Sequence, residues 1–248
     1  MAAMEPHIQY SQTKDINFVK VGAVAAFLLA ASLVATIATF YALSDATART
    51  DTQEFLDDVV DKRTHFIALV WLFTFTGLLR VPFAVGLYYA LRRWSEDYAR
   101  VAVLAGVVAG VLHALWPAPL AAIAAYIVPA WGDAGDESTR AILLSDATTL
   151  AWLSTAMISV FLVTVGIAFI SFSLVMLRIG GKLWTGLGWI GIGSGVFAIL
   201  GAFQPAAEEF VIAGTIGVAL EIIWFLGVGI GLMRGLPGEE QQPEPAGQ

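Results

Sequence analysis

Three ionisable side chains stand inside long apolar stretches of this sequence, where they could do chemistry: Arg80, His113 and Glu221. Arg80 belongs to "TGLLRVPFAVGLYY", His113 to "GVLHALWPAP" and Glu221 to "GVALEIIWFLG". At the centre of a lipid-embedded helix an arginine costs roughly 2.5–3.5 kcal/mol, so it needs a partner. A carboxylate at equal depth meets that need, because guanidinium and carboxylate groups form paired, charge-assisted hydrogen bonds. The sequence therefore predicts an Arg80–Glu221 ion pair with His113 nearby.

This ion pair has two interpretations. It can serve only to hold the order of the helices, as buried polar pairs in membrane bundles do. It can also form a site open to water or to a ligand, with Arg80 holding an anionic group and Glu221 acting as counter-ion or proton-exchanging carboxylate. One face of a later apolar stretch would line the outer half of the same cavity, at helical spacing: Thr148, Trp152, Thr155 and Ser159. The predicted ligand-binding residues are then Arg80, Glu221, His113, Thr155 and Ser159.

The residue types present argue against most catalytic centres. The chain has no cysteine, which excludes disulfides, thiolate catalysis and cysteine-ligated metal or iron–sulfur sites. The predicted depths of His65 and His113 disagree and His7 lies outside the apolar stretches, so bis-histidine haem ligation is not expected. No second histidine or carboxylate lies one turn from His113, as a metal site would require. We expect no catalytic residue, no metal and no cofactor.

The composition places these residues in a membrane. Of 248 residues 58% are hydrophobic and only 13% are charged, too few to cover the surface of a soluble domain of this length. The apolar residues fall into segments of about 20 or more with hardly a charge, which is the signature of membrane spans. The net charge of −7 comes from polar loops and the tail, and no basic cluster indicates a nucleic-acid surface. We predict an all-α integral membrane bundle of six transmembrane helices.

The six spans are predicted at residues 18–43, 65–91, 101–128, 147–177, 183–203 and 210–233. Lys and Arg gather on one side of them, at Lys14, Lys20, Arg92, Arg93, Arg100, Arg178, Lys182 and Arg234. The positive-inside rule then places both termini in the cytoplasm. Residues 1–17 form a cytoplasmic N-terminal segment, 18–234 the transmembrane domain and 235–248 a disordered tail, because that tail is rich in Pro, Glu and Gln.

Local patterns refine this topology. Apolar residues recur at helical spacing among acids in "DTQEFLDDVVDKR", which predicts a short helix at the outer interface. Ser145 or Asp146 is the predicted N-cap of the fourth span. Pro117 and Pro82 lack an N–H, so each is expected to kink its span and to free a carbonyl one turn earlier. Small residues one turn apart are expected to pack helices closely within the bundle: Gly106 and Gly110, Gly191 and Gly195, Gly227 and Gly231.

Three stretches resemble a known family. "GLYYALRRWSEDYARVAVLAG", "LRIGGKLWTGLGWIGIGSGVFAIL" and "ALEIIWFLGVGIGLMRG" are similar to segments of the uncharacterised bacterial multi-pass family called domain of unknown function 4386. The resemblance implies six spans and no settled activity. In that family an arginine often stands in the third span, where this chain has "GVVAGVLHALW", so the resemblance carries over to Glu221 alone.

The leading hypothesis is a protein of the bacterial inner, cytoplasmic membrane that binds or transports a small lipophilic or weakly acidic molecule. Its predicted partners are membrane lipids and that ligand, with no nucleic acid. The alternative is an accessory subunit of a larger complex, with partner membrane subunits and no chemistry of its own. The third candidate is an enzyme acting on a lipid or isoprenoid, with Glu221 as acid and His113 as base.

Overall fold

The structure, a computed structural model, describes residues 5–43, 52–206 and 209–235. Regular structure within these residues is entirely helical. In chain order the elements are α1 (Glu5–Ala42), α3 (Thr52–Leu91), α4 (Glu96–Leu115), α5 (Ala118–Ala122), the π-helix η1 (Ile123–Ile127), α6 (Val128–Asp133), α7 (Glu137–Ile179), α8 (Lys182–Gly201) and α9 (Glu209–Arg234). Among the described residues six helical stretches are long and apolar enough to cross a membrane, as predicted. The predicted tail falls, apart from Gly235, outside the described residues.

The six long helices form a closed ring. Each packs against the next along the chain, in the order α1, α3, α4, α7, α8 and α9, and α9 packs against α1 to close the circle. Short connections explain this order, because a tight turn between two spans leaves them antiparallel neighbours. The ring encloses an interior that all six helices can reach.

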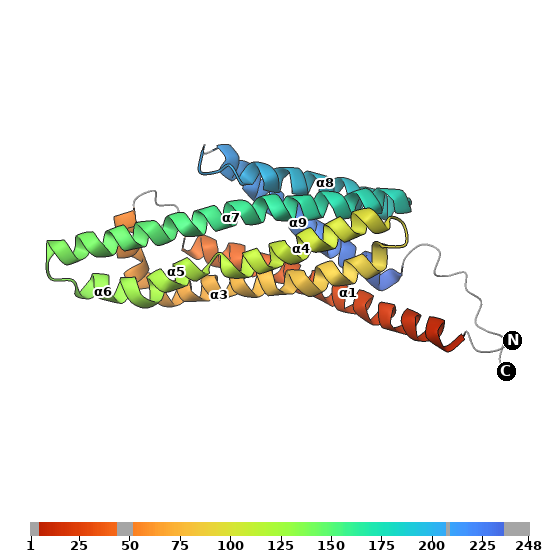
Figure 1. The fold of residues 1–248 in the computed structure, drawn as a ribbon. Helices are drawn as coiled ribbons and strands as arrows, with labels where there is room; N and C mark the ends of the chain where they lie inside the picture. The colour runs from red at the N-terminus through yellow and green to blue at the C-terminus, as the bar shows by residue number, and fades with distance from the viewer. Residues whose placement is uncertain (1–4, 44–51, 207–208, 236–248) are drawn as a thin grey trace.

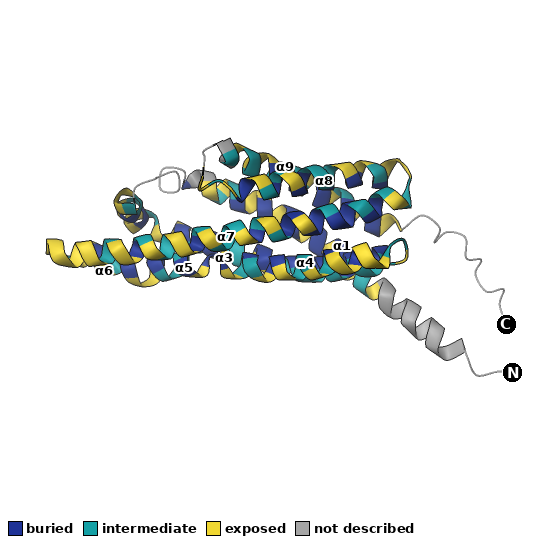
Figure 2. Cartoon of the chain, turned by 45° about the horizontal axis from the view of Figure 1, so that its top comes forward, coloured by how far each residue is buried: buried dark blue, intermediate teal, exposed yellow. Residues whose placement is uncertain are grey.

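The surface of the bundle is apolar as well as its interior. Buried residues lie on the inward faces of the helices, while many exposed positions carry large apolar side chains such as Leu104, Trp152 and Trp189 (Figure 2). A surface of this kind is stable when lipid chains surround it, because lipid solvates apolar side chains and cannot hydrogen-bond a backbone. The chain is a multi-pass membrane protein.

The helices differ greatly in length. α7 has 43 residues and α8 has 20, so at about 1.5 Å per residue α7 is roughly twice as long as α8. Figure 1 shows that α3, α7 and the α5–α6 segment run on beyond the turn that joins α8 to α9. We call this extended part of the bundle the α6 end.

A kinked helix covers the α6 end. The first turns of α3 are separated from the rest by non-helical backbone at Lys62. Leu56 and Val59 in these turns are fully buried, and the Trp131 indole N–H donates to Asp57 Oδ1 at 2.7 Å. The predicted short helix is therefore present, held by an apolar face and by a hydrogen bond. Arg63 Nε fastens the same region by donating to the carbonyl of Ala124, in η1, at 2.9 Å.

One prediction about a helix end is wrong. The fourth span begins at Glu137, not near Ser145 or Asp146, because Asp136 caps it: its carboxylate accepts from the Thr139 N–H at 2.8 Å. The Asp136 carboxylate also accepts from the hydroxyls of Ser138 and Thr139. This complete cap lies nine or ten positions before the predicted one. α3 stays helical through Pro82, and its one residue with non-helical backbone is Lys62, so the predicted kink at Pro82 involves no break in the helix.

The predicted interruption of the third span at Pro117 is confirmed, whereas the freeing of the His113 carbonyl stays a prediction. α4 ends at Leu115, and a turn at Trp116 and Pro117 separates it from α5. The Trp116 carbonyl accepts a hydrogen bond from Ser154 Oγ at 3.1 Å. A hydroxyl of α7 thereby satisfies a backbone group at the point where the helix is interrupted.

Candidate functional site

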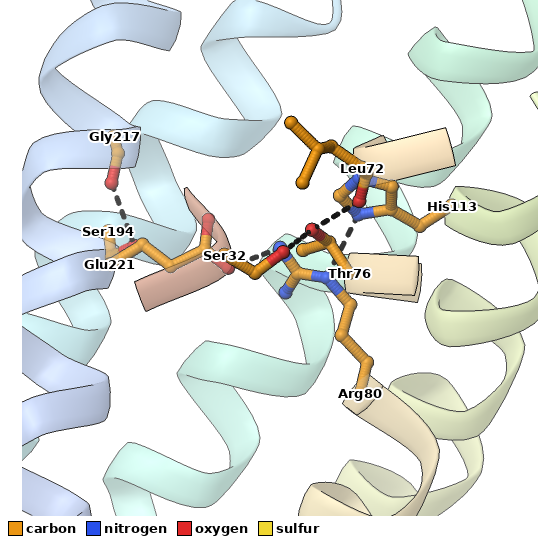
Figure 3. Close-up of polar contacts among 8 residues, drawn as sticks. All are labelled: Ser32, Leu72, Thr76, Arg80, His113, Ser194, Gly217 and Glu221. Carbon is orange, nitrogen blue, oxygen red and sulfur yellow. Dashed lines mark hydrogen bonds and ion pairs between the residues drawn. The ribbon is translucent and has the colours of Figure 1, made fainter. Parts of the chain in front are cut away.

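Arg80 lies on α3 and reaches into the interior of the ring. Its Nη2 forms an ion pair with Oε1 of Glu221 on α9 (Figure 3), and the two side chains are 5% and 8% exposed. α3 and α9 are not adjacent in the ring order, so the ion pair crosses the interior. The structure confirms the predicted Arg80–Glu221 pair.

His113, on α4, is the second partner of the guanidinium. Arg80 Nε donates a hydrogen bond of 3.0 Å to His113 Nδ1, and His113 is 4% exposed. A ring nitrogen that accepts carries no proton, so the neutral imidazole holds its hydrogen on Nε2. That Nε2–H is buried and has no hydrogen-bond partner among the described residues.

Two glycines let α3 and α4 come close enough for this contact. A Cβ at Gly77 would lie 2.7 Å from the Ala114 Cα, and one at Gly110 would lie 3.0 Å from the Gly77 carbonyl oxygen. Real Cβ atoms essentially never approach as closely as at Gly77, and the contact at Gly110 is tighter than most, so glycine at these positions lets the two backbones touch. This close approach sets the distance between Arg80, three residues after Gly77, and His113.

Aromatic rings cover the guanidinium. Arg80 Cζ lies 5.2 Å from the centroid of Phe161 and 5.6 Å from that of Phe225. Such contacts attract a cation to the face of the ring and replace water around it. Phe83 and Trp224 pack edge-on against Phe225 and against each other, which extends the aromatic layer. The sequence analysis did not find these rings, because an aromatic residue in an apolar span shows no preferred neighbour.

Buried hydroxyls complete the cluster and were also missed. Ser32 on α1 is hydrogen-bonded to Thr76 on α3, and Thr76 donates to the Leu72 carbonyl at 2.7 Å. On the far side Ser194 of α8 donates to the Gly217 carbonyl of α9 at 3.2 Å (Figure 3). In the sequence a lone serine or threonine in a span is a weak signal, since it often bonds its own backbone.

The space beside Arg80 is small. A cavity of about 20 Å³ lies between Arg80, the rings of Phe83, Trp224 and Phe225, and residues of α4 and α7 such as Gly106 and Phe172. This is room for about one water molecule. The ion pair is therefore closed against anything larger in this conformation.

A much larger cavity, of about 570 Å³, lies at the α6 end. Six aromatic side chains line it: Phe40, Phe55, Phe66, Phe73, Trp116 and Trp152. The other lining residues include Thr148, Ala151, Ser154, Thr155, Ile158 and Gln204, and none of the lining side chains described is charged. We call this space the aromatic cavity. Its size falls in the range of small-molecule sites, which are typically roughly 300–1,000 Å³ and mostly apolar.

The five predicted site residues are thus divided between two places. Arg80, Glu221 and His113 meet in the ring interior, whereas Thr155 lines the aromatic cavity with Thr148 and Trp152 of the same predicted face. Ser159 follows one turn later and donates to the Thr155 carbonyl at 3.1 Å, outside the cavity lining.

Phe73 separates the two places. It lines the aromatic cavity, and its ring centroid lies 4.6 Å from Trp116 and 6.1 Å from His113. His113 in turn packs against Phe161, which covers Arg80. One layer of side chains therefore stands between an open aromatic space and the buried polar cluster.

The fold and this site define a class of protein. It is a multi-pass membrane bundle whose helix ring encloses a buried arginine–glutamate pair. Residues 23–229 match the family described as Domain of unknown function (DUF4386), and the chain belongs to this family. The match reaches from the first spanning helix to the last and confirms the resemblance seen in the motifs. Neither the curated proteins nor the solved structures returned a match.

Proposed function

We propose that this protein binds a small lipophilic molecule inside the membrane, as a carrier or transporter of that molecule. The observation that supports the proposal is the aromatic cavity of about 570 Å³, which adjoins the Arg80 cluster through Phe73. Six rings offer a lipophilic body a large contact area, and aromatic contacts add to plain area burial. The polar group of the ligand would be directed toward Arg80, Glu221 and His113.

We also propose that the protein lies in the cytoplasmic membrane with a defined orientation. The α6 end faces the outside and both termini face the cytoplasm, on the evidence of the Lys and Arg bias. Because the chain lacks cysteine, a single cysteine introduced at Ala134 can be labelled without background. A membrane-impermeant maleimide should label it in intact cells. Labelling that occurs only after the cells are lysed would show that the α6 end faces the cytoplasm.

The binding function is tested by filling the cavity. Ala151 lines it, whereas Ala156 on the same helix is exposed and does not. Ala151→Phe should therefore occupy ligand space, and Ala156→Phe should add the same ring on the lipid side. Wild type and both variants would be purified from native membranes, and the bound small molecules identified by solvent extraction and mass spectrometry.

The expected result is a lipophilic molecule that co-purifies with wild type and with Ala156→Phe and is lost from Ala151→Phe. Equal amounts in all three proteins would mean that the molecule is a surface lipid. A wild-type protein with no co-purifying molecule other than membrane lipids would also contradict the proposal.

A further inference from the structure

We infer that the ligand of the aromatic cavity is an uncharged molecule with a hydrogen-bond-accepting oxygen, such as a ketone, and that displacement of Phe73 brings this oxygen to Trp116 and His113. The inference rests on the proposed function and narrows its ligand to one chemical class. Three observations support it. The cavity lining carries no charged side chain, three of its hydroxyl groups already donate their hydrogens to backbone carbonyls, and two buried N–H groups beside it have no acceptor among the described residues.

The lining argues against a charged ligand. None of the described side chains around the aromatic cavity is ionisable. The nearest cation in the ring interior, Arg80, already pairs with Glu221 and donates to His113. An anion in this cavity would lose its water without gaining a counter-ion, which is strongly unfavourable in an apolar site. An uncharged ligand avoids that cost.

The hydroxyl groups of the lining leave few hydrogens for the ligand. Thr148 donates to the Leu144 carbonyl at 2.7 Å and Thr155 to the Ala151 carbonyl at 3.0 Å. Ser154 donates to the Trp116 carbonyl. A hydroxyl has one hydrogen, so these three have none left to donate. On the α7 side of the cavity an oxygen on the ligand therefore finds no hydroxyl hydrogen. The other side-chain donors of the lining apart from Trp116, the Thr52 hydroxyl and the Gln204 amide, lie at the start of α3 and after α8.

Two N–H groups remain available at the inner wall. Trp116 Nε1 and His113 Nε2 are buried and have no hydrogen-bond partner among the described residues. Both residues are on or just after the last turn of α4, three positions apart, so they share one face. A buried N–H without an acceptor is costly. A ligand oxygen would satisfy one of them.

Phe73 is the side chain that stands in the way. Its ring packs against both Trp116 and His113 and also lines the aromatic cavity. It contacts the rings of both donors and also lines the space proposed for the ligand. A change of its rotamer would join the cavity to the two N–H groups without movement of a helix.

The test uses two molecules of the same shape, 9-fluorenone and fluorene. They differ only in a carbonyl oxygen that replaces two hydrogens. Their affinities for the full-length protein in lipid nanodiscs would be measured from the ligand-dependent rise in unfolding temperature. The expected result is that fluorenone binds about three- to tenfold more tightly than fluorene, which is the effect of one net hydrogen bond.

The variant Trp116→Phe keeps an aromatic ring and removes one donor. It should reduce the fluorenone-to-fluorene ratio toward one while fluorene still binds, an outcome that a general loss of structure would not produce. If Trp116→Phe does not fold, Phe73→Leu provides the second test. It should raise the ratio, because the shorter side chain uncovers both N–H groups.

Equal binding of fluorenone and fluorene to wild type would overturn the inference. So would tighter binding of fluorenone-4-carboxylate than of fluorenone, which would indicate an anionic ligand. Failure of the proposed function looks different, since Ala151→Phe would then bind both molecules as wild type does.

Discussion

The ring interior and the aromatic cavity are both rich in aromatic side chains, yet one is closed and the other is open. Beside Arg80 the rings of Phe83, Trp224 and Phe225 line a cavity of about 20 Å³, while Phe161 covers the guanidinium. At the α6 end six rings surround about 570 Å³. Aromatic content alone therefore does not decide whether a region of this bundle is packed.

The number of helices at each level explains the difference. Around the ion pair every helix of the ring contributes a side chain, from Ser32 on α1 to Ser194 on α8. At the aromatic cavity α1 and α8 are ending: Phe40 lies near the end of α1, and Gln204 follows α8. Fewer helices enclose the same cross-section there, so side chains line the space without filling it.

The largest effect is expected from breaking the ion pair. Arg80→Met or Glu221→Leu alone leaves one buried charge unpaired and should lower the free energy of unfolding by about 3–5 kcal/mol. The double variant should recover most of that loss, because no charge is then left buried. The free energy of unfolding of the two single variants and the double variant can be measured by reversible unfolding in mixed detergent micelles.

An exposed ion pair on the same fold provides the control. Glu96 and Arg100 form an i,i+4 pair of 2.8 Å with side chains 54% and 60% exposed. Arg100→Gln should leave the free energy of unfolding nearly unchanged, since water screens such pairs. If Arg80→Met proved as mild as Arg100→Gln, the ring interior would be as wet as the surface and the comparison would fail.

A smaller effect is expected from the glycine contact that closes the ring interior. Gly77→Ala would place its Cβ 2.7 Å from the Ala114 Cα, so α3 and α4 must separate. Overpacking of this kind typically costs about 1–3 kcal/mol. At Gly193 the nearest atom to an added Cβ is Leu220 Cδ1 at 3.5 Å, so Gly193→Ala should be nearly neutral in the same unfolding measurement. Equal losses of unfolding free energy in Gly77→Ala and Gly193→Ala would contradict the close contact between α3 and α4.

The smallest effect is expected at the α6 end, where interactions are exposed to water. Hydrogen bonds from Ser138 and Thr139 lower the pKa of the Asp136 carboxyl from 3.8 to about 2. Because the pKa is lowered in the folded state, this cap contributes fully above about pH 4 and is lost as the pH falls toward 2. The hydrogen-exchange protection factor at the first turn of α7, which corrects for the intrinsic pH dependence of exchange, should fall over that interval.

Two variants test whether Asp136 is the group responsible for this pH dependence. Asp136→Asn keeps a capping side chain that cannot titrate, so exchange in the first turn of α7 should no longer depend on pH through this group. Asp133→Asn changes an exposed aspartate just before the cap and should leave the wild-type pH dependence in place. A wild-type profile that persists in Asp136→Asn would assign the effect to another group.

Much of this fold could be predicted because its signals are local. Apolar length located the six spans, and the missing N–H of Pro117 located the break after α4. The start of α7 was missed because two N-cap patterns compete there, and Asp136 with its two hydroxyl neighbours forms the complete one. The pairing of Arg80 with Glu221 was predictable because deep charges are few and need partners.

The amino-acid sequence by itself determined that the chain belongs in a membrane, how many times it can cross, and at what depth its charges lie. These properties follow from hydropathy and length along single helices. Only the tertiary structure decided that Phe161 and Phe225 cover the guanidinium and that Phe73 separates it from an open cavity. Contacts between helices depend on their rotation and on the level at which each one ends, and neither quantity is a property of one helix alone.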